Sequence, residues 1–250
     1  MRRPPPSQIA NLIGPGPWTP AVRAIILTNL AVFVVTLASP ARIIEWFGLV
    51  PAEVLEHGRV WQPVTYLFVH SPTDLMHILF NMLTVWMFGV DLERRWGSRG
   101  FTKYYFVTGV GAGVCQMLVS LVPWGPVHAI YAGVPTIGAS GAVYGLLFAW
   151  ALLFPDRQIL FMFFFPLPSR VFVFIMGAIA FISAIGASGG AVAHVAHLGG
   201  MLVGWLYLKG PTDLRLELKY RLTKWRMERM RRKFNVHRGG RDDDWERRIH

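Results

Sequence analysis

Two long stretches of this 250-residue chain contain no charged side chain. Asp, Glu, Lys and Arg are absent from the 52 positions between Lys103 and Asp156 and from the 38 positions between Arg170 and Lys209. A helix that crosses a bilayer needs roughly 20 predominantly apolar residues, so these stretches have room for several. Charged residues make up 16% of the chain, against about 25% in soluble domains, and the mean hydropathy is +0.40. The sequence predicts a polytopic integral membrane protein and excludes a soluble enzyme, a disordered regulator and a secreted disulfide scaffold.

The apolar pattern predicts an all-α fold with six membrane-spanning helices. The expected spans are residues 21–38, 75–90, 100–122, 138–154, 170–187 and 191–208. Residues 39–73 contain charges and two tryptophans, so we expect a long loop at the membrane interface, where Trp is enriched. The apolar stretch 159–165 is too short to cross and is followed by prolines, which predicts an interfacial or re-entrant piece.

The distribution of charge predicts the orientation of the chain. Of its net charge of +11, most lies in residues 209–250, which hold 14 basic and 7 acidic side chains. A basic segment after a membrane helix is typical of cytoplasmic retention and of contact with anionic lipid, which we prefer to nucleic-acid binding. The predicted loops at 123–137 and 186–192 hold no Lys or Arg. The positive-inside rule and the even number of spans therefore place both termini in the cytoplasm.

These patterns divide the chain into three parts. Residues 1–19 are polar and rich in proline, which predicts a flexible cytoplasmic arm. Residues 20–208 form the predicted membrane domain, and 209–250 the basic cytoplasmic tail. The single cysteine, Cys115, lies in an apolar run, so an intrachain disulfide and a cysteine metal cluster are excluded.

Four of the polar residues inside the predicted spans stand out, since a polar side chain is unfavourable there and is therefore a functional candidate. His77 and Asn81 are four residues apart and share a face of the second span. Ser140 stands near the start of the fourth span, and His197 lies in the sixth. Each has an ordinary explanation, because a membrane serine commonly bonds its own helix backbone and polar pairs can join helices.

Together, Ser140 and His197 have the chemistry of a nucleophile and its general base. Serine becomes a nucleophile when a base takes its proton, and histidine titrates near neutral pH. The two are 57 positions apart, so they meet only if two helices pack together. The charge-free stretches supply no third, acidic member, which predicts a dyad. His77 and Asn81 carry N–H groups that could donate hydrogen bonds to a developing oxyanion.

These residues resemble the rhomboid family of intramembrane serine proteases over about residues 20–208. The family's His-x-x-x-Asn matches His77 and Asn81, and its Gly-x-Ser-Gly matches Gly138-Ala139-Ser140-Gly141. The remaining matches are the last-helix His-x-x-Gly-x-x-x-Gly at His197, Gly200 and Gly204, and the Glu-x-Arg-x-Gly at Glu93, Arg95 and Gly97. One departure is Trp61-Gln62, where the family has Trp-Arg.

The resemblance implies a role for each matched residue. Ser140 is then the nucleophile and His197 the base, while His77, Asn81 and the backbone N–H of Ser140 form the oxyanion hole. Tyr144 packs under the catalytic histidine. His194 lies one turn before His197, but only His197 has glycines at the spacing of the motif. The supporting residues carried over are Gly138, Gly141, Tyr144, Gly200 and Gly204.

The implied activity is cleavage of transmembrane protein substrates within the lipid bilayer, through an acyl-enzyme and without a metal or organic cofactor. The compact six-helix form resembles bacterial members, which suggests the inner membrane. One alternative is a rhomboid-like pseudoprotease that binds membrane clients. A second is a transporter with His77, His194 and His197 as proton relays. The remaining histidines, to which we assign an interfacial or loop position without a catalytic role, are His57, His70 and His128.

Overall fold

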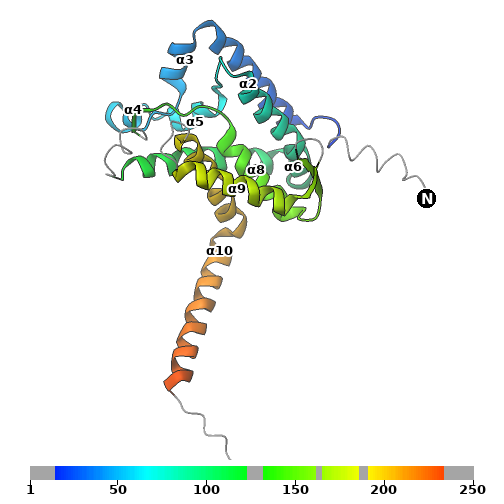
Figure 1. Cartoon of the computed structure of the whole chain (residues 1–250), viewed down its shortest axis with the longest axis vertical. Helices are drawn as coiled ribbons and strands as arrows, with labels where there is room; N and C mark the ends of the chain where they lie inside the picture. The colour runs from blue at the N-terminus through cyan, green and yellow to red at the C-terminus, as the bar shows by residue number, and fades with distance from the viewer. Residues whose placement is uncertain (1–14, 123–131, 162–164, 186–190, 234–250) are drawn as a thin grey trace, which may run out of the picture. The chain divides into compact units, whose positions relative to one another are not determined.

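The structure is a computed structural model of the whole chain, and it describes residues 15–122, 132–161, 165–185 and 191–233 (Figure 1). Some of the predictions fall outside the described residues. They concern most of the arm, much of the loop at 123–137 with His128, the start of the loop at 186–192 and the end of the tail. The chain divides into two compact units, of which the first ends at Leu208 and the second begins at Lys209.

Most of the described residues are helical, which confirms the all-α prediction. The long helices are α2 (Pro20–Ala38), α6 (Leu75–Ser120), α8 (Ser140–Leu153), α9 (Ser169–Ile185) and α10 (Ala191–Lys233). The segment between α2 and α6 forms the short helices α3 (Pro40–Phe47), α4 (Pro51–His57), α5 (Gln62–Thr65) and η1 (Tyr66–Phe68). The remaining elements are two short strands, β1 (Gln158–Phe161) and β2 (Phe165–Pro168).

Helix α6 contains a sharp bend at Gly97, with φ 72° and ψ 163°. A positive φ of this size is accessible to glycine and unfavourable for other residues. The bend separates the two segments that the sequence predicts as spans 75–90 and 100–122, so Gly97 provides the whole turn between them. Of the described helices, α2 and α6 are long and apolar enough to cross a membrane, while α8 and α9 are shorter apolar helices.

The predicted interfacial piece at 159–165 is part of a small antiparallel hairpin. β1 pairs with β2 from Gln158 opposite Pro168 to Phe161 opposite Phe165. Proline lacks the N–H that a helix interior requires, so the prolines of β2 are compatible with an edge strand and not with a helix. Just before β1, Arg157 forms an ion pair with Asp91 of α6, and the Trp150 Nε1–H donates to the same carboxylate.

Gln62, at the departure from the family motif, is fully buried in the segment between α2 and α6. Its Oε1 accepts a hydrogen bond from the N–H of Val50 (3.0 Å), and its Nε2 donates to the carbonyl of Glu45 (3.2 Å). In the same segment, the Nε of Arg59 forms an ion pair with the carboxylate of Glu53 at 3.1 Å. The neutral amide of Gln62 therefore joins α3 to the N-cap residue of α4.

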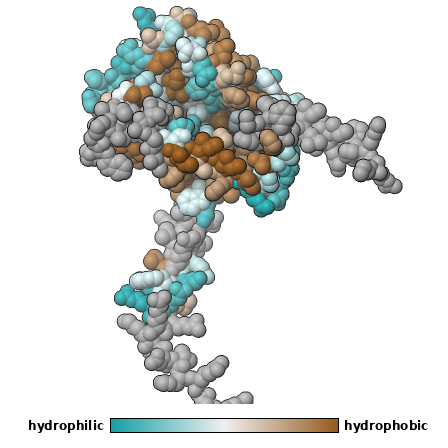
Figure 2. All heavy atoms as spheres, in the orientation of Figure 1, coloured by the Kyte–Doolittle hydropathy of each residue, from teal (hydrophilic) through white to brown (hydrophobic). Residues whose placement is uncertain are grey.

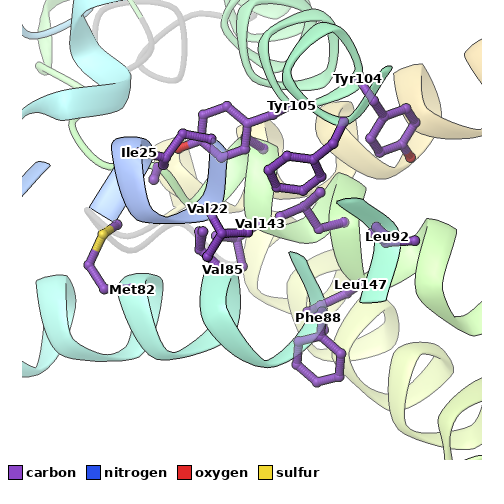
Figure 3. Close-up of a cluster of buried hydrophobic side chains, with 14 of the residues drawn as sticks. Val22, Ile25, Met82, Val85, Phe88, Leu92, Tyr104, Tyr105, Val143 and Leu147 are labelled. Carbon is purple, nitrogen blue, oxygen red and sulfur yellow. The ribbon is translucent and has the colours of Figure 1, made fainter. Parts of the chain in front are cut away.

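The core lies among α2, the two halves of α6 and α8. Figure 3 shows side chains of these helices pointing toward one another, and the labelled residues are Val22, Ile25, Met82, Val85, Phe88, Leu92, Tyr104, Tyr105, Val143 and Leu147. Large apolar side chains are also exposed on the outside, such as Phe174 (78% exposed) and Ile182 (69%) of α9. Apolar atoms cover the outer face of α9 in Figure 2. An apolar exterior of this kind marks a surface that contacts a membrane or another protein.

Glu93 connects the end of the first half of α6 to the beginning of α2. Its buried carboxylate accepts hydrogen bonds from the hydroxyls of Thr19 and Ser98 and from the N–H groups of Ala21 and Val22. These N–H groups belong to the first turn of α2, where a helix lacks internal acceptors. Burial raises the pKa of Glu93, but the four hydrogen bonds outweigh it and hold the pKa below its ordinary value.

We expect Glu93→Gln to lower the free energy of unfolding by about 2 kcal/mol at pH 7, because hydrogen bonds to a charged acceptor are stronger than those to an amide. Since the pKa is lower in the folded state, this stabilisation is present above the unfolded pKa of 4.5 and is lost as the pH falls through the folded pKa. Unfolding in mixed SDS micelles at pH 7 and pH 3 measures both effects. The matched control is Glu56→Gln, at an exposed glutamate, and equal stabilities of the two variants at pH 7 would contradict the prediction.

Candidate active site

The structure brings Ser140 and His197 together. The Nε2 of His197 lies 2.8 Å from the Oγ of Ser140, although the two residues are 57 positions apart. Ser140 is the first residue of α8, and His197 lies in the second turn of α10. In the tautomer with hydrogen on Nδ1, the serine hydroxyl donates to Nε2, which is the arrangement that proton transfer to the histidine requires.

The ring of Tyr144 packs against one face of the His197 imidazole. Tyr144 follows Ser140 by one turn of α8, and its ring stacks on that of His197 with centroids 4.2 Å apart and an interplanar angle of 6°. Offset stacking of this kind contributes about 0.5–1.5 kcal/mol beyond the burial of area. Tyr144 therefore restricts the orientation of the imidazole toward Ser140.

Glycines allow α8 and α10 to approach at backbone distance. A Cβ at Gly200 of α10 would overlap the carbonyl oxygen of Gly141 of α8. One turn later, a Cβ at Gly204 would overlap the hydroxyl of Tyr104, which donates to the carbonyl of Gly145 (2.8 Å). The predicted Gly-x-x-x-Gly contact of the last helix is thus directed at α8.

The amino end of α8 presents free backbone N–H groups beside Ser140. The first helical hydrogen bond of α8 runs from the N–H of Val143 to the carbonyl of Ala139 (3.0 Å). The N–H groups of the preceding three residues have no acceptor inside the helix, and the helix dipole favours negative charge at this end. An oxyanion that forms on a carbonyl attacked by Ser140 would develop next to these donors.

His77 lies against the residue two positions before Ser140. Gly138 has φ +113°, and a Cβ there would be 2.5 Å from the Nε2 of His77. The Nδ1 of His77 accepts a hydrogen bond from the N–H of Ser71 (3.3 Å), so Nε2 carries the hydrogen and faces the loop before α8. Gly138 is therefore required both by its backbone conformation and by the position of His77.

Asn81 is buried one turn further along α6. Its Nδ2 donates a hydrogen bond to the carbonyl of His77 (2.7 Å), which leaves one of its two amide hydrogens for another acceptor. The structure thus places the predicted oxyanion donors His77 and Asn81 on one face of α6. Of the two, His77 is the one in contact with the loop that precedes Ser140.

His70 is a buried member of the site that the sequence analysis left without a role. Its Nε2 accepts a hydrogen bond from the N–H of Ala139 (3.5 Å), and its Nδ1 lies 3.3 Å from the carbonyl of Phe68, to which it donates. Its ring lies 5.0 Å from that of His77. Burial, together with the neighbouring His77, lowers the pKa of His70 to about 4. Nothing in the sequence distinguishes it from the exposed His57, because neither residue belongs to one of the matched motifs.

Three further contacts fix the loop before Ser140 to the segment between α2 and α6. Leu49 and Thr136 exchange two backbone hydrogen bonds of 2.8 Å, and the N–H of Gly138 donates to the carbonyl of Tyr66 (2.9 Å). The Tyr66 hydroxyl in turn donates to the carbonyl of Gly109 (2.6 Å). Within the described part of the chain, no three His, Cys, Asp or Glu residues converge as a metal site.

Residues 57–210 match the profile of the Rhomboid domain family. Among similar proteins, the mitochondrial rhomboid protein 1 of Saccharomyces cerevisiae is 36% identical over 140 residues, which is 55% of this chain and 38% of the yeast protein. The rhomboid protease GlpG of Yersinia pestis is 25% identical over 193 residues, 75% of this chain and 61% of GlpG. The rhomboid protease GluP of Bacillus subtilis is 27% identical over 162 residues, 64% of this chain and 27% of GluP. The matched part is thus less than two thirds of each of these relatives.

We expect the stability that His70 provides to depend on pH between about 6.5 and 4. The folded state keeps this imidazole neutral, whereas the unfolded chain binds a proton below pH 6.5. Stability therefore falls with falling pH through this range, by up to about 1.4 kcal/mol per pH unit. The free energy of unfolding at pH 7, 6 and 5 is compared between wild type and His70→Asn, with the exposed His57→Asn as control. The wild-type advantage over His70→Asn should shrink as the pH falls, and a constant difference would contradict this assignment.

Proposed function

Because the chain belongs to the rhomboid family, we propose that it is an intramembrane serine endopeptidase that cleaves transmembrane helices of substrate proteins. The observation that supports this proposal is the 2.8 Å contact between the Ser140 hydroxyl and His197 Nε2, formed by two helices that pack through glycine. A pseudoprotease does not need this contact, whereas a serine protease does.

In the proposed reaction, His197 removes the proton of the Ser140 hydroxyl as the serine oxygen attacks a backbone carbonyl of the substrate. The protonated His197 then gives that proton to the leaving amine, which produces an acyl-enzyme. His197 then takes a proton from the water that attacks the acyl-enzyme and gives it to the Ser140 oxygen, so that the ester bond breaks and the carboxylic product is released. Each step uses one serine and one histidine and needs no cofactor.

The tetrahedral intermediate carries a negative charge that needs hydrogen-bond donors. We assign this role to the backbone N–H of Ser140 at the start of α8, to the Nε2–H of His77 and to the free amide hydrogen of Asn81. Loss of one such donor typically reduces the rate by about 100- to 1,000-fold. His70 is a positioning residue in this scheme, because it accepts a hydrogen bond from the N–H of Ala139 and so restricts the orientation of the following amide, that of Ser140.

The proposed substrate and orientation follow from the short α8 and from the charges. Helix α8 has 14 residues, about 21 Å at 1.5 Å per residue, less than the hydrocarbon thickness of about 30 Å. Ser140 at its end then lies below the bilayer surface, where a substrate helix must unwind locally to expose a carbonyl.

We further propose six spans, both termini in the cytoplasm of a bacterial inner membrane, a flexible arm at 1–19 and a lipid-contacting tail at 209–250. The proposed partners are transmembrane substrates and the bilayer, and not nucleic acid.

Ser140→Ala is expected to abolish cleavage of a transmembrane reporter, because it removes the oxygen that forms the acyl-enzyme in the proposed reaction. The matched control is Ser120→Ala, since the Ser120 hydroxyl donates to the carbonyl of Met117 in its own helix. Cleavage is measured by gel shift of the purified reporter in detergent, with circular dichroism to verify folding. A Ser140→Ala protein that cleaves at the wild-type rate would exclude the proposed mechanism.

His197→Ala is expected to reduce cleavage to background, and also to reduce labelling of Ser140 by a fluorophosphonate. The labelling measures the nucleophilicity of the serine independently of substrate binding. Mass spectrometry of the labelled protein identifies the modified residue. Rapid labelling of Ser140 in the absence of the His197 imidazole would show that another group is the base.

A further inference from the structure

His194 contacts the edge of the catalytic histidine and takes no part in the reaction proposed above. It lies three residues before His197, which puts both on one face of α10. The two rings are perpendicular, with centroids 5.4 Å apart and an interplanar angle of 83°. Tyr144 covers a face of His197, so the imidazole is enclosed by one ring on its face and by a second ring at right angles.

Both histidines leave a buried nitrogen without a partner. The Nδ1 atoms of His194 and of His197 are buried and have no hydrogen-bond partner among the described residues. A buried polar atom without a partner typically costs about 1–3 kcal/mol, so two such atoms on adjacent rings indicate a bound water. The Nδ1 of His197 must carry its hydrogen for Nε2 to accept from Ser140. Its partner must therefore be an acceptor, and the described residues provide none.

We propose that His194 is a positioning residue for the dyad, which acts through one buried water molecule that hydrogen-bonds to Nδ1 of both histidines. The proposal rests on the proposed function. The water accepts from the Nδ1–H of His197 and donates to the Nδ1 of His194, which then carries its own hydrogen on Nε2. This arrangement selects the His197 tautomer that can take the serine proton. It performs, without a charge, the orienting task that a carboxylate performs in a three-residue site.

The proposal separates hydrogen bonding from packing at position 194. His194→Phe keeps an aromatic ring at the edge of His197 but cannot bond to the water. His194→Gln loses the ring but keeps an amide that can accept from the water. We therefore expect His194→Phe to lower kcat by about tenfold with KM unchanged, the factor that corresponds to one lost hydrogen bond. We expect His194→Gln to keep kcat within about threefold of the wild type.

Two readouts distinguish positioning from a structural role. The first is the rate of fluorophosphonate labelling of Ser140, which should fall about tenfold in His194→Phe and not in His194→Gln. The second is the ¹⁵N spectrum of histidine-labelled protein, in which His197 should show the Nδ1–H tautomer in wild type and a mixture in His194→Phe. His194→Met serves as a second apolar variant if the bulkier ring prevents folding. The control is His57→Phe, at an exposed histidine.

The outcomes separate this inference from the proposed function. If Ser140→Ala leaves cleavage unchanged, the proposed function fails and this inference with it. If cleavage depends on Ser140 but His194→Phe and His194→Met have wild-type kcat, only the inference is overturned. Equal losses in the apolar variants and in His194→Gln, with folding intact, would show that position 194 acts by packing, which also overturns it. Loss in the apolar variants with retention in His194→Gln supports it.

Discussion

The backbone contact between α8 and α10 is the constraint on which the site depends. Because Gly200 has no side chain, its Cα approaches the carbonyl of Gly141 at a distance that any Cβ would prevent. In a bilayer, where burial of apolar surface does not drive helices together, such close packing is a main source of helix association. Ser140 is the residue directly before Gly141, and His197 lies three residues before Gly200. The contact that joins the two helices therefore also sets the distance between the Ser140 hydroxyl and the His197 imidazole.

A second constraint fixes the direction of the loop before Ser140. Three of its N–H groups donate to the segment between α2 and α6: that of Thr136 to the Leu49 carbonyl, that of Gly138 to the Tyr66 carbonyl and that of Ala139 to the Nε2 of His70. The N–H of Ser140 comes next and has no acceptor inside α8, and we assign it to the proposed oxyanion site. The short helices between α2 and α6 thus act as a support for the candidate oxyanion site. Gln62 belongs to this support, since it joins two of these helices through a neutral amide.

The sequence was sufficient for those parts of the site that rest on regular spacing. His77 with Asn81, Ser140 with Tyr144, and His197 with Gly200 are each separated by about one helical turn, so each pair was visible once its helix was recognised. The resemblance to the rhomboid family connects these pairs into one site, and the match of residues 57–210 to the Rhomboid domain confirms that resemblance. The meeting of Ser140 with His197 was a hypothesis about packing, which spacing alone could not decide. The number of spans and the roles of the residues remain predictions.

The features that sequence reasoning missed lie outside regular helices. His70 contacts Ala139 across 69 positions, and its burial is a property of the loop fold that no local pattern records. The pairing of β1 with β2 is a second such feature, because the sequence shows that the apolar stretch 159–165 is too short to cross a membrane but does not show that it pairs with the prolines that follow.

Orientation of His197 is the remaining physical problem for the proposed dyad, which has no carboxylate. A buried acid would need its own desolvation compensated in a span, where the expected partners are few. In the structure Tyr144 stacks on the ring of His197 and His194 lies at its edge, and we propose that these contacts orient the imidazole in place of a charge. Such restraint requires rigid neighbours on both helices, and the glycine contact between α8 and α10 provides them. The close packing of the helices and the direction of the base therefore have the same cause.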